Sequence, residues 1–322
     1  MHRKPALPYR RFAFGLALLL ALAGAASAAN PAIAIDSKAA QGELEIQFKG
    51  RKLLVYAFAT NQFKPYVREL YTLRGENVLR DAPPDHLHHH GLMYAVHVNG
   101  INFWEEHRTP GIQKHVELVR QSATVDAKGV PEAQFTELIH WLGPTNRGAS
   151  DSLAAAVLVE RRTLWLSVDE AKQEVALRWD GQFQVGPNAG RVTIRGANYT
   201  GLGLRLPESF NHVAKFQNSE GLPYHGPNTQ NVIAARWTSV SGALNGHEGM
   251  LVLFGSTDSR RFFFTMLDPF AYLSVTQGLD KQPLEYGPGD KFSVSYLLTV
   301  YSETRTTEFI RRRCDQWDKE RK

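Results

Sequence analysis

Four histidines fall within five positions of this 322-residue chain, directly after a Pro-Pro-Asp sequence. They are His86, His88, His89 and His90, and Asp85 precedes them. On an extended backbone alternate side chains share a face, so we expect His86, His88 and His90 to project together, with neighbouring Cβ atoms about 7 Å apart, and His89 to face away. The two prolines disfavour a helix on the approach and so favour the extended backbone. This density of imidazoles predicts chemistry rather than core packing.

Three kinds of role are open to this cluster. Histidine is the commonest transition-metal ligand, so His86, His88 and His90 could hold a divalent metal, completed by a carboxylate such as Glu105 or Glu106. Imidazole also titrates near neutral pH, so the same side chains could form a metal-free acid–base and hydrogen-bonding site for a polyhydroxylated substrate. In the third alternative the histidines only cap backbone groups of a polar loop.

Carboxylates and an aromatic ring near the cluster suit carbohydrate chemistry. Trp104 offers a flat apolar face for a pyranose ring. One of Glu105 and Glu106 could be a partly buried carboxylate whose raised pKa suits a general base. Glu208 is a third candidate, because it follows a glycine-spaced stretch where the backbone could approach a ligand. The residues expected to bind the substrate are Arg68, Asp85, His90, Trp104, Asn211 and His225.

Together these residues predict an enzyme that transfers a proton at or near the anomeric carbon of a sugar. His86, His88 or His89 would act as the acid, and one of the three glutamates as the base. Epimerisation, elimination and hydrolysis all fit such a pair. The alternatives are a metal-dependent hydrolase or lyase, and a non-catalytic carbohydrate-binding protein. The expected partner is a small-molecule or oligosaccharide substrate.

The string PPDHLHHHGLMYAVHVNGINFW closely resembles the Pro-Pro-Asp-His-x-His-His-x-Gly-Leu stretch of the bacterial PmoA-like domain family of unknown function. Further matching stretches are FKPYVREL at 63–70, TGLGLRLPE at 200–208, ARWTSVSG at 235–242 and the late YGPGDKFSVSYLLTVY. His90 stands where that family usually has arginine. The family label comes from a methane monooxygenase subunit, a membrane enzyme with several transmembrane helices. This sequence has none after its leader, so we do not expect that activity here.

The chain is also similar to galactose-mutarotase-like β-supersandwiches in its length, its richness in strands and its late Pro-Gly-Asp before a long terminal strand. That similarity implies a concave sheet face that binds sugars, with a histidine acid and a carboxylate base around the ring. A fold of this kind hosts many functions, so the similarity bears on architecture first.

Short strands separated by turn residues must position the candidate side chains. Asn-Gly, Gly-Pro and Pro-Gly pairs mark the turns, and a helix capped by Thr304 or Thr306 is expected up to about Lys319. Neither a repeat nor a linker divides the chain, so the sequence predicts an all-β fold, one large β-sandwich over 29–322 with a C-terminal helix. The segments rich in β-branched and aromatic residues lie at 44–48, 52–59, 92–98, 174–179, 192–195, 250–254, 262–266 and 292–301.

Residues 1–28 have the layout of a cleavable signal peptide: four basic residues, an apolar run at 12–26 and the small residues of Ala26-Ser27-Ala28 at the cut. We therefore predict a periplasmic or secreted protein with no membrane contact after cleavage. The chain has 37 Lys and Arg against 32 Asp and Glu, and without the leader 33 basic residues remain. This near balance argues against a nucleic-acid partner. The single Cys314 allows no internal disulfide, and His107 and His115 are expected on the surface.

Overall fold

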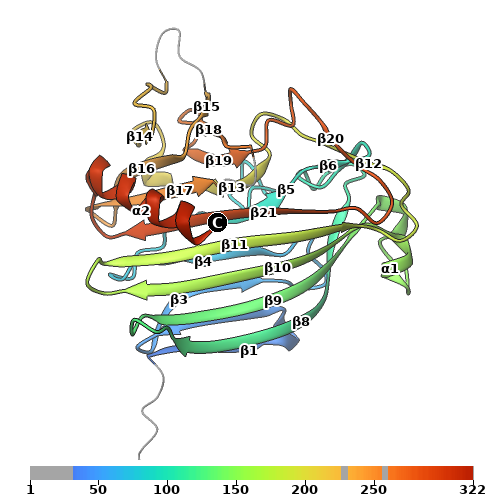
Figure 1. Cartoon of the computed structure of the whole chain (residues 1–322), viewed down its shortest axis with the longest axis horizontal. Coiled ribbons are helices and arrows are strands. Elements are labelled where there is room, and N and C mark those ends of the chain that lie inside the picture. The colour runs from blue at the N-terminus through green and yellow to red at the C-terminus, as the bar shows by residue number, and fades with distance from the viewer. Residues whose placement is uncertain (1–31, 226–230, 256–259, 322) are drawn as a thin grey trace, which may run out of the picture. The chain divides into compact units, whose positions relative to one another are not determined.

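The computed structural model describes residues 32–225, 231–255 and 260–321, which lie within one compact unit, Pro31–Lys322. Strands dominate these ranges (Figure 1). Within them no helix is both long and apolar enough to cross a membrane. The predicted signal peptide falls outside the described residues and stays a prediction.

One large antiparallel sheet has nine strands in the described part of the chain, in the order β1-β2-β3-β4-β5-β13-β19-β18-β15. Its alternation of buried and partly exposed residues is plain in β2, where Leu44, Ile46 and Phe48 are buried and the residues between them are not. The strands are β1 (Ile33–Lys38), β2 (Glu43–Phe48), β3 (Arg51–Ala57), β4 (Tyr66–Leu70), β5 (Leu92–Ala95), β13 (Gly201–Arg205), β15 (Val232–Ala234), β18 (Phe262–Met266) and β19 (Tyr272–Thr276).

A second large sheet has eight described strands, in the order β14-β16-β17-β21-β11-β10-β9-β8, and a small sheet has the order β20-β12-β6-β7. The eight are β8 (Ile112–Val125), β9 (Pro131–Leu142), β10 (Ala156–Asp169), β11 (Glu174–Val185), β14 (Lys215–Asn218), β16 (Trp237–Leu244), β17 (His247–Gly255) and β21 (Lys291–Tyr301). The small sheet has β6 (His97–Val98), β7 (Ile101–Asn102), β12 (Val192–Arg195) and β20 (Leu284–Tyr286). The short helical turns are η1 (Ala39–Gln41), η2 (Pro144–Asn146), α1 (Ser152–Ala155) and η3 (Glu208–Phe210).

The two large sheets pack face to face. The ring of Tyr56 on β3 lies 4.9 Å from the ring of Phe135 on β9, centroid to centroid, so side chains of both sheets share one core. In Figure 1 the long green strands β8–β10 cross in front of the blue strands β1 and β3. The predicted all-β sandwich is therefore confirmed, and all eight predicted segments coincide with or overlap strands.

The predicted C-terminal helix is also confirmed, as α2 (Thr307–Glu320). The Thr306 hydroxyl oxygen accepts a hydrogen bond from the Phe309 amide at 3.2 Å, which caps the first turn. Ile310, Cys314 and Trp317 are buried against β17 and β21, so the helix covers the outer face of the second sheet. Burial also raises the pKa of Cys314 to about 11, which leaves it a thiol at neutral pH.

Candidate active site

The four histidines lie on a loop, residues 81–91, that we call the histidine loop. Its backbone makes two successive tight turns, because the His86 amide donates to the Pro83 carbonyl and the His89 amide to the His86 carbonyl, both at 2.9 Å. The predicted extended backbone is therefore wrong. Turns abolish the alternation of faces, so His86, His88 and His89 gather on one side and His90 points elsewhere.

These three imidazoles line a cavity of about 370 Å³, here called the histidine cavity. Their ring centroids are 4.5 Å apart for His88 and His89, 4.6 Å for His86 and His89, and 5.9 Å for His86 and His88. The other lining residues are Trp104, Glu105, Tyr199, Phe264, Met266, Pro269, Phe270 and Tyr272. The predicted meeting of imidazoles, a carboxylate and aromatic rings is thus present, in a cavity large enough for a small organic ligand.

Phe270 forms part of one wall of the histidine cavity, and Arg205 stacks on its ring. The guanidinium of Arg205 lies 3.5 Å from the Phe270 ring centroid, and the same ring meets His86 at 4.8 Å and His89 at 5.2 Å. Arg205 is buried, with Asp85 at 3.5 Å as its carboxylate neighbour, and burial lowers the pKa of its guanidinium to about 10. The cation therefore holds the aromatic wall from behind.

The environment of the cavity keeps two of its histidines neutral. Burial lowers the pKa of His89 to about 3, and a proton on this ring would also be repelled by protonated His88 or His86 and by Arg205. Burial and the Lys64 charge also lower the pKa of His88. A neutral imidazole has one nitrogen ready to accept a proton at neutral pH, so both rings are in the base form.

His90 lies outside the histidine cavity, in what we call the ion network, formed by Lys64, Asp81, His90 and Glu106. Its Nδ1 is 2.9 Å from Asp81 Oδ1 and its Nε2 is 2.9 Å from Glu106 Oε1, while its ring stacks on Tyr66 at 3.9 Å. Burial opposes a charge on this ring, but the two carboxylates prevail and raise the pKa of His90. Both ring nitrogens are thus already engaged.

Glu106 belongs to the same network and carries a lowered pKa, not the raised one predicted for a general base. Burial alone would raise the pKa of Glu106, but the hydrogen bond from His90 and the charge of Lys64 lower it to about 2. Lys64 is fully buried, and it also donates to the Trp104 carbonyl at 3.0 Å. Glu106 is a fixed anion behind the cavity, whereas the neighbouring Glu105 lines the cavity itself.

Two further carboxylates orient the exposed histidines. Asp85 Oδ2 lies 2.9 Å from Nδ1 of His86, and Glu105 Oε2 lies 3.1 Å from Nε2 of His107. The predicted metal set of His86, His88 and His90 is not brought together, because His90 turns into the ion network. Across the described residues no group of three or more His, Cys, Asp or Glu side chains is arranged to hold a metal ion.

The structure places Glu208 and Arg68 away from the histidine cavity. Glu208 lies on η3 with 76% of its side chain exposed, and it pairs with Arg80 at 3.2 Å. Arg68, on β4, forms an ion pair with Glu43 at 2.6 Å. Neither side chain lines the cavity.

Asn211 and His225 also lie outside the lining. The Asn211 side-chain oxygen accepts a hydrogen bond from the Ala271 amide at 2.8 Å, and so fixes the segment that carries Phe270. His225 Nε2 bonds the Thr265 hydroxyl at 2.9 Å. Their contacts are with the protein, so they support the walls rather than line them.

Sequence reasoning missed most of the aromatic wall. Tyr199, Phe264, Phe270 and Tyr272 line the cavity, and three of them come from the 262–272 segment. The sequence does contain a signal for this wall, because aromatic residues are dense on both sides of the Asp-Pro pair in that segment.

The family of the chain follows from comparison with protein-family models. One model matches residues 43–315, a range that includes the whole histidine loop, and it describes a family of unknown function, DUF6807. The chain belongs to this family. The resemblance to the PmoA-like family that the histidine motif suggested was therefore wrong, because the model that matches is that of DUF6807. A comparison with curated protein sequences finds no significant match.

Solved structures similar to this member of DUF6807 include glycoside hydrolases. The GH36 α-galactosidase AgaB from Geobacillus stearothermophilus is 12% identical, with 84% of this chain and 41% of that chain covered and a TM-score of 0.47. The α-galactosidase from Lactobacillus brevis is 8% identical, with 84% and 39% covered and a TM-score of 0.45. The chain thus spans about two fifths of the length of these enzymes. At such identities and TM-scores the likeness does not bear on function.

Proposed function

We propose that this protein is a sugar-processing enzyme that performs acid–base chemistry near the anomeric carbon in the histidine cavity. The observation that supports the proposal is the convergence of three imidazoles and the Glu105 carboxylate on one aromatic-walled cavity. Imidazole and carboxylate groups are the usual acids and bases of enzymes, and aromatic faces suit the C–H face of a sugar ring.

His88 is the proton carrier in this proposal. Its lowered pKa makes it a base at neutral pH, the reverse of the acid role predicted from the sequence. His88 takes a proton from a sugar hydroxyl, and the resulting imidazolium returns it to the oxygen at which a bond breaks or a ring opens. His86, held through Nδ1 by Asp85, and Glu105 complete the set of proton-transfer groups. Taken from a hydroxyl, the proton fits epimerisation through ring opening; in an elimination the same base would take the proton from carbon, and in a hydrolysis from the attacking water.

The proposed substrate is a small sugar or a terminal sugar unit. A cavity of about 370 Å³ lies near the lower end of the usual range for small-molecule sites. His89 Nδ1 and Trp104 Nε1 are buried without a hydrogen-bond partner among the described residues. Buried polar atoms normally have a partner, so these two nitrogens favour a ligand that carries hydroxyl groups.

A ligand screen is the first experiment. Mono- and oligosaccharides, including oxidised forms, are tested by thermal shift, since a ligand at about 100 times its dissociation constant adds about 2.7 kcal/mol of stability. Each hit is then incubated with the enzyme and followed by proton NMR, which reports epimerisation, elimination and hydrolysis alike. Binding without any conversion would support the carbohydrate-binding alternative.

Two variants separate catalysis from binding. His88→Gln should lower turnover by about 10²- to 10⁴-fold with little change in the dissociation constant, whereas Trp104→Ala should weaken binding. His247→Gln, an exposed histidine at the start of β17, is the matched control and should change neither. If His88→Gln retains full turnover, the proton relay is refuted.

Export through the predicted leader is part of the proposal. N-terminal sequencing of protein recovered outside the cytoplasm should give a chain that starts near Ala29. Recovery of a chain that still begins at Met1 would contradict it.

A further inference from the structure

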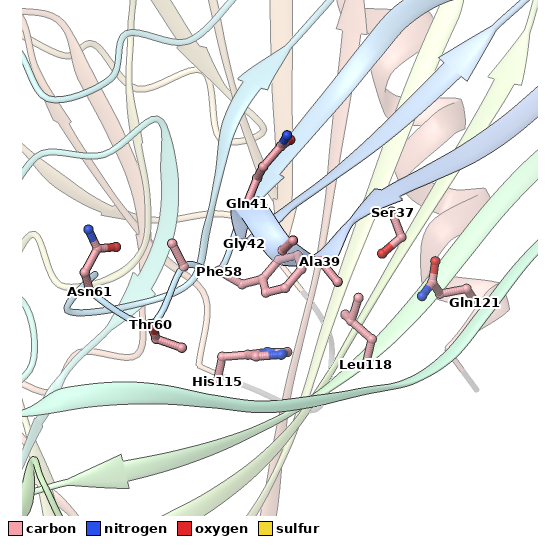
Figure 2. Close-up of a pocket in the computed structure, with 12 residues that line it drawn as sticks. Ser37, Ala39, Gln41, Gly42, Phe58, Thr60, Asn61, His115, Leu118 and Gln121 are labelled. Atoms are coloured by element: carbon pink, nitrogen blue, oxygen red, sulfur yellow. The ribbon is translucent and has the colours of Figure 1, made fainter.

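A second cavity, of about 520 Å³, lies where η1 and the segment after β3 meet β8 (Figure 2). It shares no lining residue with the histidine cavity, and we call it the edge cavity. Its lining residues are Ser37, Ala39, Ala40, Gln41, Gly42, Phe58, Ala59, Thr60, Asn61, His115, Leu118 and Gln121.

His115 is the titratable residue of the edge cavity, and it is not the surface residue predicted from the sequence. Only 16% of its side chain is exposed, and its ring lies 4.5 Å from the Phe58 ring. Its Nδ1 is 2.6 Å from Oε1 of Glu137, a carboxylate with no exposed surface. Nε2 has no hydrogen-bond partner among the described residues, so it is the nitrogen left for a ligand. Figure 2 shows the His115 side chain beside Phe58, Thr60 and Leu118.

A buried charge cluster stands behind this histidine. The second oxygen of Glu137 accepts a hydrogen bond from the Tyr56 hydroxyl, and that hydroxyl also accepts one from Arg162 at 3.1 Å. Arg162 pairs directly with Glu160 at 2.8 Å, so its charge is already matched. Glu137 is then an additional buried carboxylate, and its Oε1 contacts Nδ1 of His115. Burying such a charge is costly, yet here it fixes the orientation of one cavity histidine.

The rest of the lining indicates the ligand. Gln41, Asn61 and Gln121 contribute amides, Ser37 and Thr60 contribute hydroxyls, and no lining residue besides His115 can carry a charge. Amides and hydroxyls both donate and accept hydrogen bonds, as do the hydroxyl groups of a sugar. A hydroxyl also suits either state of His115, because it can donate to a neutral Nε2 or accept from a protonated one.

We propose that the edge cavity is a second binding site, for a neutral saccharide, in which His115 Nε2 bonds a ligand hydroxyl. The Phe58 ring and the Leu118 side chain then face the apolar side of the sugar ring. This site is independent of the reaction proposed for the histidine cavity, because the two cavities have no residue in common.

Calorimetric titration with cellobiose, maltose and lactose tests the proposal, with glucuronate as a charged comparison. At least one neutral disaccharide should bind with a dissociation constant below about 10 mM and more tightly than glucuronate. Gln121→Leu, at an exposed position that should tolerate the change, should weaken that binding about three- to tenfold through the loss of one hydrogen bond. Gln184→Leu on β11 is the matched control and should have no effect.

His115→Asn is the decisive variant, because the asparagine amide can still donate to Glu137 while Nε2 is lost. It should also weaken binding about three- to tenfold, with a thermal melt that shows a folded protein. If His115→Asn does not fold, Gln121→Leu decides alone. The proposal is overturned if no neutral disaccharide binds, or if Gln121→Leu leaves that binding unchanged.

Discussion

His89 should make the folded protein sensitive to mild acid, and His89→Phe should remove that sensitivity. The ring is 9% exposed and packs against Phe270, Tyr272 and Trp104. Its pKa is lowered to about 3 from the ordinary histidine value of 6.5. Between these two pH values the unfolded chain binds a proton at position 89 and the folded chain does not, so stability falls as the pH falls from 6.5 towards 3. Phenylalanine keeps the aromatic packing and cannot be protonated.

The expected size follows from that difference in pKa. At about pH 5 the pH is about 1.5 units below the pKa of the unfolded histidine, so the unfolded state is stabilised by protonation and the folded state is not. At about 1.36 kcal/mol per unit, His89 lowers the free energy of unfolding by about 2 kcal/mol between about pH 7.5 and pH 5. Between about pH 7.5 and pH 5, the free energy of unfolding of His89→Phe should therefore fall by about 2 kcal/mol less than that of the wild type. This difference does not depend on the stability of the variant at pH 7.5.

Urea unfolding followed by tryptophan fluorescence at both pH values provides the measurement. The other titrating groups are common to wild type and variant, so they cancel in the comparison of pH dependence. Tyr272→Phe is the matched control, because it alters the same wall and adds or removes no group that titrates in this range; its pH dependence should equal that of the wild type. Equal pH dependence in His89→Phe and the wild type would refute the burial of a neutral imidazole at this position.

Three further substitutions test how the histidine loop and the sandwich are held. Gly91→Ala should cost about 1–3 kcal/mol of unfolding free energy in urea titrations, because the new Cβ would lie 2.6 Å and 2.8 Å from two backbone oxygens of β4. Gly148→Ala is the control and should change the stability little, because its Cβ would meet nothing within 4 Å. Lys64→Met should cost about 3–5 kcal/mol by the same assay, since it removes the buried ammonium and leaves His90 as the remaining partner of the partly buried Glu106. Trp317→Ala should cost about 3–5 kcal/mol, seen as a lower thermal midpoint, because this ring of α2 is fully buried against the second sheet. A loss below about 1 kcal/mol in any of the three would contradict the packing on which it is based.

The sandwich could be predicted because its strands carry a local signal. In β2 the alternation of Leu44, Ile46 and Phe48 with polar residues fixes which face is buried, and in α2 Thr306 marks the first turn. The order of strands within each sheet had no such signal. It brings residues far apart in the chain side by side, as in the pairing of β13 with β5 and β19, which only the complete fold determines.

The course of the histidine loop was mispredicted although a local signal existed. The two prolines favour extended backbone, but Pro84-Asp85 also occupies the two central positions of a turn, where proline and aspartate are common. A turn at Pro84-Asp85 predicts that His89, not His90, shares a side with His86 and His88. His89 then enters the cavity and His90 leaves it, as the structure has them.

The two adjacent glutamates could not be told apart from the sequence. Glu105 lines the cavity, whereas Glu106 is bound to Lys64, a residue 42 positions earlier whose burial no local pattern reveals. The direction of a pKa shift depends on that distant partner. A carboxylate next to an aromatic pair suggests a raised pKa, but the partners reverse the sign and lower it to about 2.

The ion network also explains how a loop without regular structure can hold the geometry that the proposed acid–base chemistry needs. Lys64 joins the Trp104 carbonyl, on one wall of the histidine cavity, to Glu106, and Glu106 joins His90 at the end of the histidine loop. Separating such mostly buried charges is costly, so the cavity wall and the loop are linked stiffly. Glu106 stays ionised well below the pH at which histidines titrate, since its pKa is about 2. In the proposed reaction a proton can therefore move on and off His88 while Glu106 keeps its charge. The proposed acid–base chemistry requires this, because the group that titrates must not disturb the contacts that hold the loop.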